Sequence, residues 1–343
     1  MASRLAEDPR IDPRLKAMFG ERELMAVGDV ASREELLVLE NSEEGDARWA
    51  QFAAMVDSLD SDLIAPSAGL ATTEHRVVSD PDGNTINIRI IRPEGSAAAP
   101  CVYYIHGGGM QTLSCDDGNY RAWGRMIAAN GVAVAMVDFR NAIRPSSVPE
   151  VAPFPAGLND CVSGVKWLHA NAAELNLDPA RIIVAGDSGG GNLTIATGLK
   201  LKQDGDIGLI KGLYALCPCF AGRWPFPESP SSSENNGIML DLHNNRGAVG
   251  YGIEAFEAGN PLAWPGFATA DDVAGLPPVV ISVNECDPLR DEGVDFYRLL
   301  LGSGVPARCR QVMGTVHATE IFLACCPEIS RDTARDLAAF CKG

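Results

Sequence analysis

One serine in the sequence, Ser188, has the surroundings that a reactive hydroxyl needs. It lies in the stretch IIVAGDSGGG at residues 182–191, where an apolar run typical of a buried strand ends in a G-x-S-x-G pattern and a helical stretch follows. A sharp turn between a strand and a helix lifts the serine hydroxyl above the sheet, and flanking glycines avoid a collision of Cβ atoms with the neighbouring chain. A glycine turn with an incidental serine would also fit the pattern. The strand before it and the helix after it favour a nucleophile.

A second glycine-rich segment has the composition needed to stabilise the negative charge that such an attack creates. His106-Gly107-Gly108-Gly109 directly follows an apolar run at residues 102–105. A developing oxyanion needs two or three backbone N–H donors that converge on one point, and glycines let the backbone come that close. A flexible glycine turn is the alternative, but the pairing with the Ser188 motif favours an oxyanion hole.

A serine nucleophile also needs a base, and the sequence holds five histidines. In hydrolases with this serine motif the chain order is Ser, then Asp or Glu, then His, so only His243 and His317 qualify. His317 lies in a loop after the last apolar run, whereas no acid in a suitable loop lies between Ser188 and His243. We therefore predict His317 as the base.

The third member of such a triad should orient the imidazole and stabilise its charged form. Asp287 comes shortly after the apolar run at residues 279–283 and directly before a proline that fixes a turn. Asp291 and Glu292 fall where a helix should begin, and helix capping explains them without catalysis. We predict Asp287 as the acid, with Glu285 as the alternative because glutamate fills this role in some hydrolases.

Composition and charge exclude several other classes of protein. The 343 residues carry a net charge of −17 and no basic run, whereas nucleic acids and anionic membrane surfaces are bound by clustered Lys and Arg. The N-terminal residues lack the apolar core of a signal peptide, and no apolar stretch is long enough to span a bilayer. The ten cysteines include no C-x-x-C pair. We expect reduced thiols, neither disulfides nor a zinc site, and a cytoplasmic location.

The elements that must position these residues alternate between strand and helix patterns. An alternating stretch at Thr85–Arg92 follows a turn and predicts a hairpin. Beyond it, helical stretches at residues 160–174 and 192–203 lie between short apolar runs. These runs occupy residues 102–105, 132–137, 182–185, 213–216 and 279–283, with a weaker run at 308–313. Continuous apolar strands that alternate with helices indicate a parallel sheet covered on both faces.

Two segments stand outside this alternation. Residues 1–65 have amphipathic helical patterns and no strand pattern, and residues 221–264 hold a proline- and serine-rich loop followed by a helical stretch at 240–257. The second segment is too long for a plain connection. We predict N-terminal cap helices at 1–65, a catalytic core at 66–220 and 265–343, and a cap insertion at 221–264.

Together the motifs resemble those of the hormone-sensitive-lipase-like branch of the α/β-hydrolases, also called bacterial esterase family IV. Its HGGG, G-D-S-x-G-G and D-P-L-x-D-E motifs and a late histidine occur here in the expected order. Gly189, where the wider family usually has alanine, and residues 8–14, 137–142 and 263–265 resemble the brefeldin A esterase subgroup. Ala318 departs from the family pattern, which usually has glycine after the histidine.

The resemblance implies the α/β-hydrolase fold, an eight-stranded, mostly parallel sheet with helices on both faces and a helical cap. It implies that the backbone N–H groups of Gly108, Gly109 and Gly189 form the oxyanion hole. The implied activity is hydrolysis of small-molecule carboxylic esters through an acyl-enzyme on Ser188, with no cofactor and no metal.

Substrate preference follows less directly. A two-part cap should bound the pocket and favour acyl chains of about two to six carbons, because a methylene that does not fit costs strain. The resemblance adds bulky or cyclic esters, including lactones. Met110, Trp224 and Phe226 are candidates for the pocket wall, although each could instead pack in the core or cap. Amide or thioester hydrolysis, and a receptor on the same fold that has lost its histidine, are the alternatives. A homodimer is compatible with the sequence.

Overall fold

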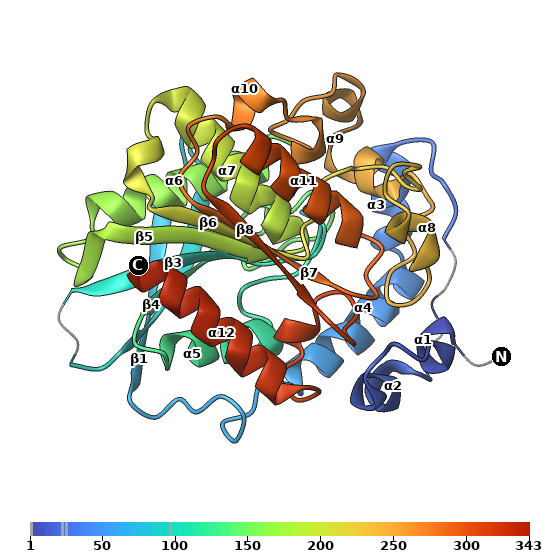
Figure 1. Ribbon diagram of the computed structural model, residues 1–343, viewed down its shortest axis with the longest axis horizontal. Helices are drawn as coiled ribbons and strands as arrows, with labels where there is room; N and C mark the ends of the chain where they lie inside the picture. The colour runs from blue at the N-terminus through green and yellow to red at the C-terminus, as the bar shows by residue number, and fades with distance from the viewer. Residues whose placement is uncertain (1–2, 22–23, 25–26, 96–97) are drawn as a thin grey trace.

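Eight strands form one sheet in the part of the chain that the structure describes (Figure 1). The structure is a computed structural model that describes residues 3–21, 24, 27–95 and 98–343, so residues 1–2, 22–23 and 25–26 of the predicted N-terminal segment lie outside it. The strands are β1 (Leu70–Val78), β2 (Thr85–Pro93), β3 (Ala99–Ile105), β4 (Ala133–Asp138), β5 (Leu177–Asp187), β6 (Gly212–Leu216), β7 (Val279–Asn284) and β8 (Ala307–Val312). Their order is β1-β2-β4-β3-β5-β6-β7-β8. Among these strands, β2 pairs antiparallel with β1 and β4, and all other pairings are parallel, which confirms the predicted mostly parallel sheet.

The burial of the strands follows their sequence patterns. Every residue of β3, β4, β6 and β7 is buried, which is why these strands consist mainly of apolar residues. In β2, near the edge of the sheet, Ile86, Ile88 and Ile90 are buried while the side chains between them are partly exposed. The alternation in that strand therefore marks one covered face.

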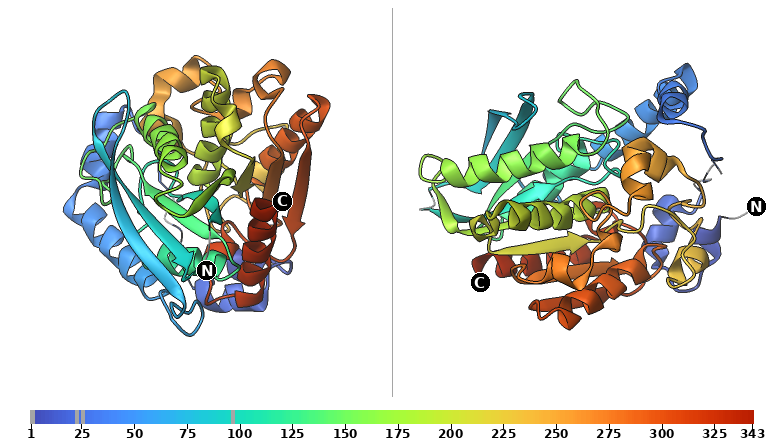
Figure 2. Two further views of the ribbon diagram at one scale, coloured as in Figure 1. Left: turned by 90° about the vertical axis from the view of Figure 1, so that its left-hand side faces the viewer. Right: turned by 90° about the horizontal axis from the view of Figure 1, so that it is seen from above.

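Helices cover both faces of the sheet (Figure 1 and Figure 2). One face carries α5 (Gly118–Ala128) and α12 (Pro327–Lys342), and the other carries α6 (Ala156–Ala170), α7 (Gly189–Asp204) and α11 (Arg290–Gly302). Short 3₁₀ helices lie at η1 (Ile207–Leu209), η2 (Pro265–Phe267) and η3 (Thr319–Ile321). Because the central strands are parallel, the loops that follow β3, β5, β7 and β8 meet at one edge of the sheet.

Helices from two distant parts of the chain gather at that edge, on the right of Figure 1. They are α1 (Arg4–Glu7), α2 (Pro13–Phe19), α3 (Arg33–Glu40) and α4 (Glu43–Asp57) from the N-terminal part, with α8 (Ser231–Glu234) and α9 (Arg246–Glu257) from the second; α10 (Ala270–Val273) follows them. Asn245 exchanges hydrogen bonds of 2.8 and 2.9 Å with the backbone of Val30. Arg10 lies 3.2 Å from Glu234. Such contacts join the two segments, and their role as a two-part cap stays a prediction.

Two of the predicted helices have bounds that differ by a turn or more from the predicted ones. The helix predicted at 160–174 begins earlier, directly after Pro155, and ends at Ala170. The helix predicted at 240–257 begins only at Arg246. Before it, the side chain of Asn236 bonds the Leu242 backbone N–H at 2.8 Å and the Asp241 carboxylate at 2.9 Å. Side chains of this kind compete with helical hydrogen bonds, which explains the late start.

Candidate active site

Ser188 occupies the turn between β5 and α7, with φ of 54° and ψ of −118°. Few residues other than glycine adopt this conformation, so surrounding contacts must hold it. The Ser188 N–H donates to the Leu216 carbonyl at 2.8 Å, and the Ser188 carbonyl accepts from the Asn192 N–H at 3.0 Å. A Cβ on Gly186 would lie 2.5 Å from the Gly190 carbonyl oxygen, so the flanking glycines permit the sharp turn.

The three residues predicted as a triad lie in one hydrogen-bonded chain. The Nε2 atom of His317 lies 2.9 Å from the Ser188 Oγ, and its Nδ1 lies 2.7 Å from the Asp287 Oδ2. The second oxygen of Asp287 accepts from the Leu289 N–H at 2.9 Å. Glu285, the alternative acid, instead accepts from the Gly314 N–H at 2.6 Å. The carboxylate that bonds the imidazole is therefore that of Asp287.

The electrostatic surroundings of His317 favour its charged form. Burial of the ring lowers the pKa, but the charge of Asp287 and its hydrogen bond outweigh this effect and raise the pKa of His317 above its ordinary value. An imidazole held in this way can take a proton from Ser188 and keep the resulting charge paired.

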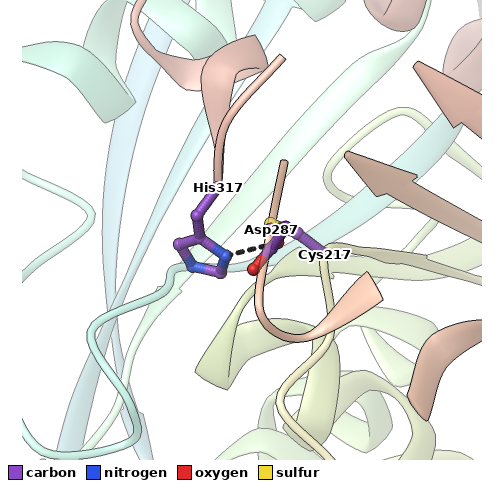
Figure 3. A group of neighbouring side chains, drawn as sticks. All are labelled: Cys217, Asp287 and His317. Atoms are coloured by element: carbon purple, nitrogen blue, oxygen red, sulfur yellow. Dashed lines mark hydrogen bonds and ion pairs between the residues drawn. The ribbon is translucent and has the colours of Figure 1, made fainter. Parts of the chain in front are cut away.

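Cys217 lies beside two members of this chain, as Figure 3 shows. The Cys217 thiol and the ligand atoms of Asp287 and His317 lie within 4.8 Å of one another, the one such group of potential metal donors in the described residues. Burial raises the pKa of the Cys217 thiol well above its ordinary value, so the sulfur stays protonated at neutral pH. Since Asp287 and His317 already bond each other, this set is arranged as a hydrogen-bonded pair beside a neutral thiol.

The glycine-rich loop after β3 lies against the serine turn. Gly108 and Gly109 have φ of 93° and 62°, in the region that favours glycine. A Cβ on Gly189 would lie 2.7 Å from the Gly109 nitrogen and 2.6 Å from the Met110 nitrogen. The backbone at Gly189 and the backbone of the loop thus approach each other as closely as an oxyanion hole requires. This contact also explains why glycine stands at 189, since an alanine would force the loop away.

A cavity of about 280 Å³ opens beside Ser188 and His317. Both parts of the predicted cap contribute to its wall, through Phe52 from α4 and through Met239, Leu240 and Leu242. The other lining residues come from the core: Gly108, Gly109, Leu113, Asn119, Tyr120, Asp187, Cys219, Leu289, Ala318, Ile321 and Phe322. The wall is mainly apolar, which suits the uncharged body of a small ligand.

Comparison with known proteins places this arrangement in a family. Residues 102–321, more than half of the chain, match a family model described as the alpha/beta hydrolase fold. The chain belongs to the α/β-hydrolase family. This hydrolase is 33% identical to the carboxylesterase NlhH of Mycobacterium tuberculosis over 256 residues, which cover 70% of this chain and 72% of that protein.

Similarity to solved structures shows to which branch of the family the chain belongs. The hydrolase is similar to esterase Est22, with 64% identity, a TM-score of 0.99 and full coverage of both chains. It is also similar to brefeldin A esterase, a bacterial homologue of human hormone-sensitive lipase, with 35% identity, a TM-score of 0.88 and coverage of 98% and 94%. The enzyme is thus a carboxylic ester hydrolase of the hormone-sensitive-lipase-like branch, as the sequence motifs predicted.

The three residues proposed from the sequence for the pocket wall do not line the cavity of the esterase. Met110 is 1% exposed and packs in the core, although it directly follows the glycine-rich loop. The Trp224 indole donates to the Glu292 carboxylate at 2.9 Å. Phe226 lines a second cavity, together with Glu292. Proximity to a motif in sequence did not place these side chains beside Ser188.

Several supporting residues of the esterase had no sequence signal. The Tyr104 and Tyr120 hydroxyls donate to the Asp187 carboxylate at 2.8 and 2.9 Å, and Tyr120 also accepts from the Gly107 N–H at 2.7 Å. Tyr120 thereby connects the serine turn to the glycine-rich loop. In a single sequence, a tyrosine within an apolar strand or helix cannot be distinguished from an ordinary core residue.

His106 and Glu292 have structural roles that their motifs only partly suggested. The His106 ring stacks on Phe139 with centroids 4.4 Å apart, and its Nε2 lies 3.3 Å from the buried Asp138. The carboxylate of Glu292 lies in the first turn of α11, as predicted, but it also accepts from the Phe220 N–H at 2.6 Å. Burial raises the pKa of Glu292 to about 8. This carboxyl group connects α11 to the start of the predicted cap insertion.

Membrane-spanning helices and disulfides were the other two features to examine in the chain. Among the described residues, none of the helices has the length and apolar character needed to cross a membrane. All ten cysteines lie in the described ranges and none forms a disulfide.

Proposed function

We propose that the esterase cleaves its substrate with Ser188 as nucleophile and His317 as general base and acid. Asp287 orients the imidazole and stabilises its charged form. The hydrogen-bonded chain from Ser188 Oγ through His317 to Asp287, with distances of 2.9 and 2.7 Å, is the observation that supports these roles.

The reaction proceeds in two halves. Ser188 Oγ attacks the ester carbonyl carbon while His317 Nε2 takes the hydroxyl proton, which gives a tetrahedral oxyanion. The bond to the alcohol oxygen then breaks, and the leaving alcohol takes that proton from His317. Water attacks the acyl-enzyme in the same way, and the acid product leaves as Ser188 regains its proton.

The backbone N–H groups of Gly108, Gly109 and Gly189 stabilise the oxyanion in both halves. Gly108 and Gly109 line the cavity together with Ser188, and the backbone of Gly189 approaches the glycine-rich loop closely. Donors fixed before the reaction need no reorganisation as charge develops on the carbonyl oxygen, so they lower the barrier efficiently.

The proposed substrates are esters with short acyl chains of about two to six carbons, since an extra methylene gains burial only where the wall leaves room. The cavity of about 280 Å³ is at the small end for ligand sites, which supports this size class. Est22 has been solved with p-nitrophenol, the alcohol part of a p-nitrophenyl ester, so such esters are suitable probes. Bulky and cyclic esters, including lactones, stay a prediction from the similarity to brefeldin A esterase.

The test of this proposal is the variant Ser188→Ala with p-nitrophenyl butyrate. We expect kcat to fall by about 10⁴ or more, because the variant lacks the hydroxyl that lies against His317 and forms the acyl-enzyme. The fold should persist, as circular dichroism would show, since the change removes one oxygen at a cavity wall. Activity retained in the folded variant would refute the role of Ser188. A panel of matched amide and thioester substrates would test the alternative acyl bonds.

A cytoplasmic location and a homodimer stay predictions. Ten unpaired thiols support a reducing compartment, in which disulfides do not persist. Light scattering of the purified protein would test the dimer.

A further inference from the structure

One polar side chain in the wall of the cavity has no role in the reaction described above. Asn119 lines the cavity from the first turn of α5 and is 2% exposed. Its Oδ1 atom is buried and has no hydrogen-bond partner among the described residues. The neighbouring polar groups differ in this respect, because Tyr120 and Asp187 bond each other.

An unpaired amide oxygen in such a place is costly. A buried acceptor without a partner loses its hydrogen bonds to water and gains none from the protein, and native structures contain few such groups. Asn119 is nevertheless held in position. The helix around it is fixed by a bond of 3.0 Å from the Gly118 N–H to Asp57 and by a contact of 2.8 Å between Arg121 and Asp60. A polar group without a partner at a cavity wall, on a helix fixed in this way, has the properties of a ligand contact.

The chemistry of this contact is that of a neutral group. A carboxamide offers one acceptor and two donors, and rotation about its last side-chain bond exchanges their positions. A hydroxyl matches both, since it donates to the oxygen or accepts from the nitrogen. A carboxylate is disfavoured, because the buried carboxyl group of Asp187 also lines this cavity and none of the Lys or Arg residues that the structure describes does.

We propose that Asn119 binds a hydroxyl group of the substrate, so that the preferred esters carry a hydroxyl close to the reacting carbonyl. The small volume of the cavity, about 280 Å³ shared by Asn119 and Ser188, places that hydroxyl within a few atoms of the scissile bond. This inference rests on the proposed function and adds a substrate class to it.

The experiment compares two pairs of esters that differ only by a hydroxyl in place of a methyl group. On the acyl side they are p-nitrophenyl 3-hydroxybutyrate and p-nitrophenyl 3-methylbutyrate. On the alcohol side they are 2-hydroxyethyl butyrate and propyl butyrate. The readout is the ratio of kcat/KM within each pair, which does not depend on the fraction of active enzyme.

The variants are Asn119→Leu, which keeps the size of the side chain and removes its polar groups, and Asn119→Ala, which truncates it in case leucine disturbs the fold. Asn130→Leu is the matched control. Asn130 follows the same helix, and its amide donates to the Met126 carbonyl at 2.9 Å, away from the cavity.

We expect the ratio of the hydroxylated ester to its methyl analogue to fall about tenfold in at least one pair for both Asn119 variants, the effect of one lost neutral hydrogen bond. The ratio should not change in Asn130→Leu. Ratios in both pairs that stay the same in the Asn119 variants as in the wild type would overturn the inference. Such a result would leave the proposed function intact, since the activity of Ser188→Ala tests that function separately.

Discussion

At the scale of single residues, the choice between two nearby aspartates can be tested directly. Asp287→Asn places an amide against the Nδ1 of His317 and favours the wrong tautomer of the ring, so kcat should fall by about 10³–10⁴. Asp291 instead accepts from the Ser231 N–H at 2.8 Å and pairs with Arg290 at 2.8 Å. Asp291→Asn should therefore cost far less. Steady-state kinetics of both variants checks this, and the opposite order of effects would mean that Asp287 is not the acid.

The pH dependence of the rate belongs to the same scale. His317 acts as a base only when neutral, so kcat/KM should fall as the pH drops through its pKa. Because Asp287 raises that pKa, the acid limb should lie above the ordinary imidazole value of about 6.5. In Asp287→Asn the limb should move to lower pH, since the charge that raised the pKa is gone. A wild-type rate that stays constant down to pH 4 would rule out a histidine base.

The residues of the active site differ in how well the sequence alone predicts them. Ser188 and Asp287 belong to local patterns in which a few neighbouring letters fix the backbone, and the structure places both beside His317. Asn119 and Leu242 line the cavity through contacts made between distant segments, and no local pattern marks such positions. Sequence reasoning therefore predicted the hydrogen-bonded chain and missed the pocket wall.

At the scale of elements, apolar runs in the sequence predicted the positions of the strands well. The bounds of the helices in the predicted cap were predicted less well. A parallel strand buried on both faces has almost no other sequence solution, which is why β3 to β7 lie where the runs predicted. The edge strand β8 has no buried residue and corresponds to the weaker run. The start of α9 depends on side-chain bonds around Asn236 that compete with the helix, and a pattern of hydrophobic spacing does not contain them.

The helix α4 should limit the length of the acyl chain, because its Phe52 lines the cavity. In the wild type, kcat/KM along a p-nitrophenyl ester series should peak within about two to six carbons. Phe52→Ala should move the peak to longer chains, with a gain of about fourfold for each methylene newly accommodated.

The matched control for Phe52→Ala is Phe226→Ala, which removes a phenylalanine ring from the wall of the second cavity. It should leave the peak unchanged. A shift in Phe226→Ala and none in Phe52→Ala would contradict the assignment of the cavity wall. A wild-type peak at long chains such as palmitate, with a rise at an oil–water interface, would mean a lipase.

At the scale of the whole molecule, the thiols report on packing and redox state together. Nine of the ten cysteines are buried and Cys309 is partly exposed, and burial raises the pKa values of these thiols. Since the thiolate is the reactive form, a thiol reagent such as Ellman's should label at most about one cysteine rapidly in the native protein. In denaturant without reductant it should label all ten. Fewer than ten would reveal disulfides, and fast labelling of several in the native state would contradict the packing.

The central claim, that this molecule hydrolyses esters through Ser188, is tested most directly by a fluorophosphonate label followed by mass spectrometry of the intact protein and its peptides. A fluorophosphonate reacts with a serine only where a base and an oxyanion hole activate it. One adduct should form, it should map to Ser188, its formation should abolish esterase activity, and the Ser188→Ala variant should not react. An adduct on another serine, or equal labelling of the Ser188→Ala variant, would contradict the account.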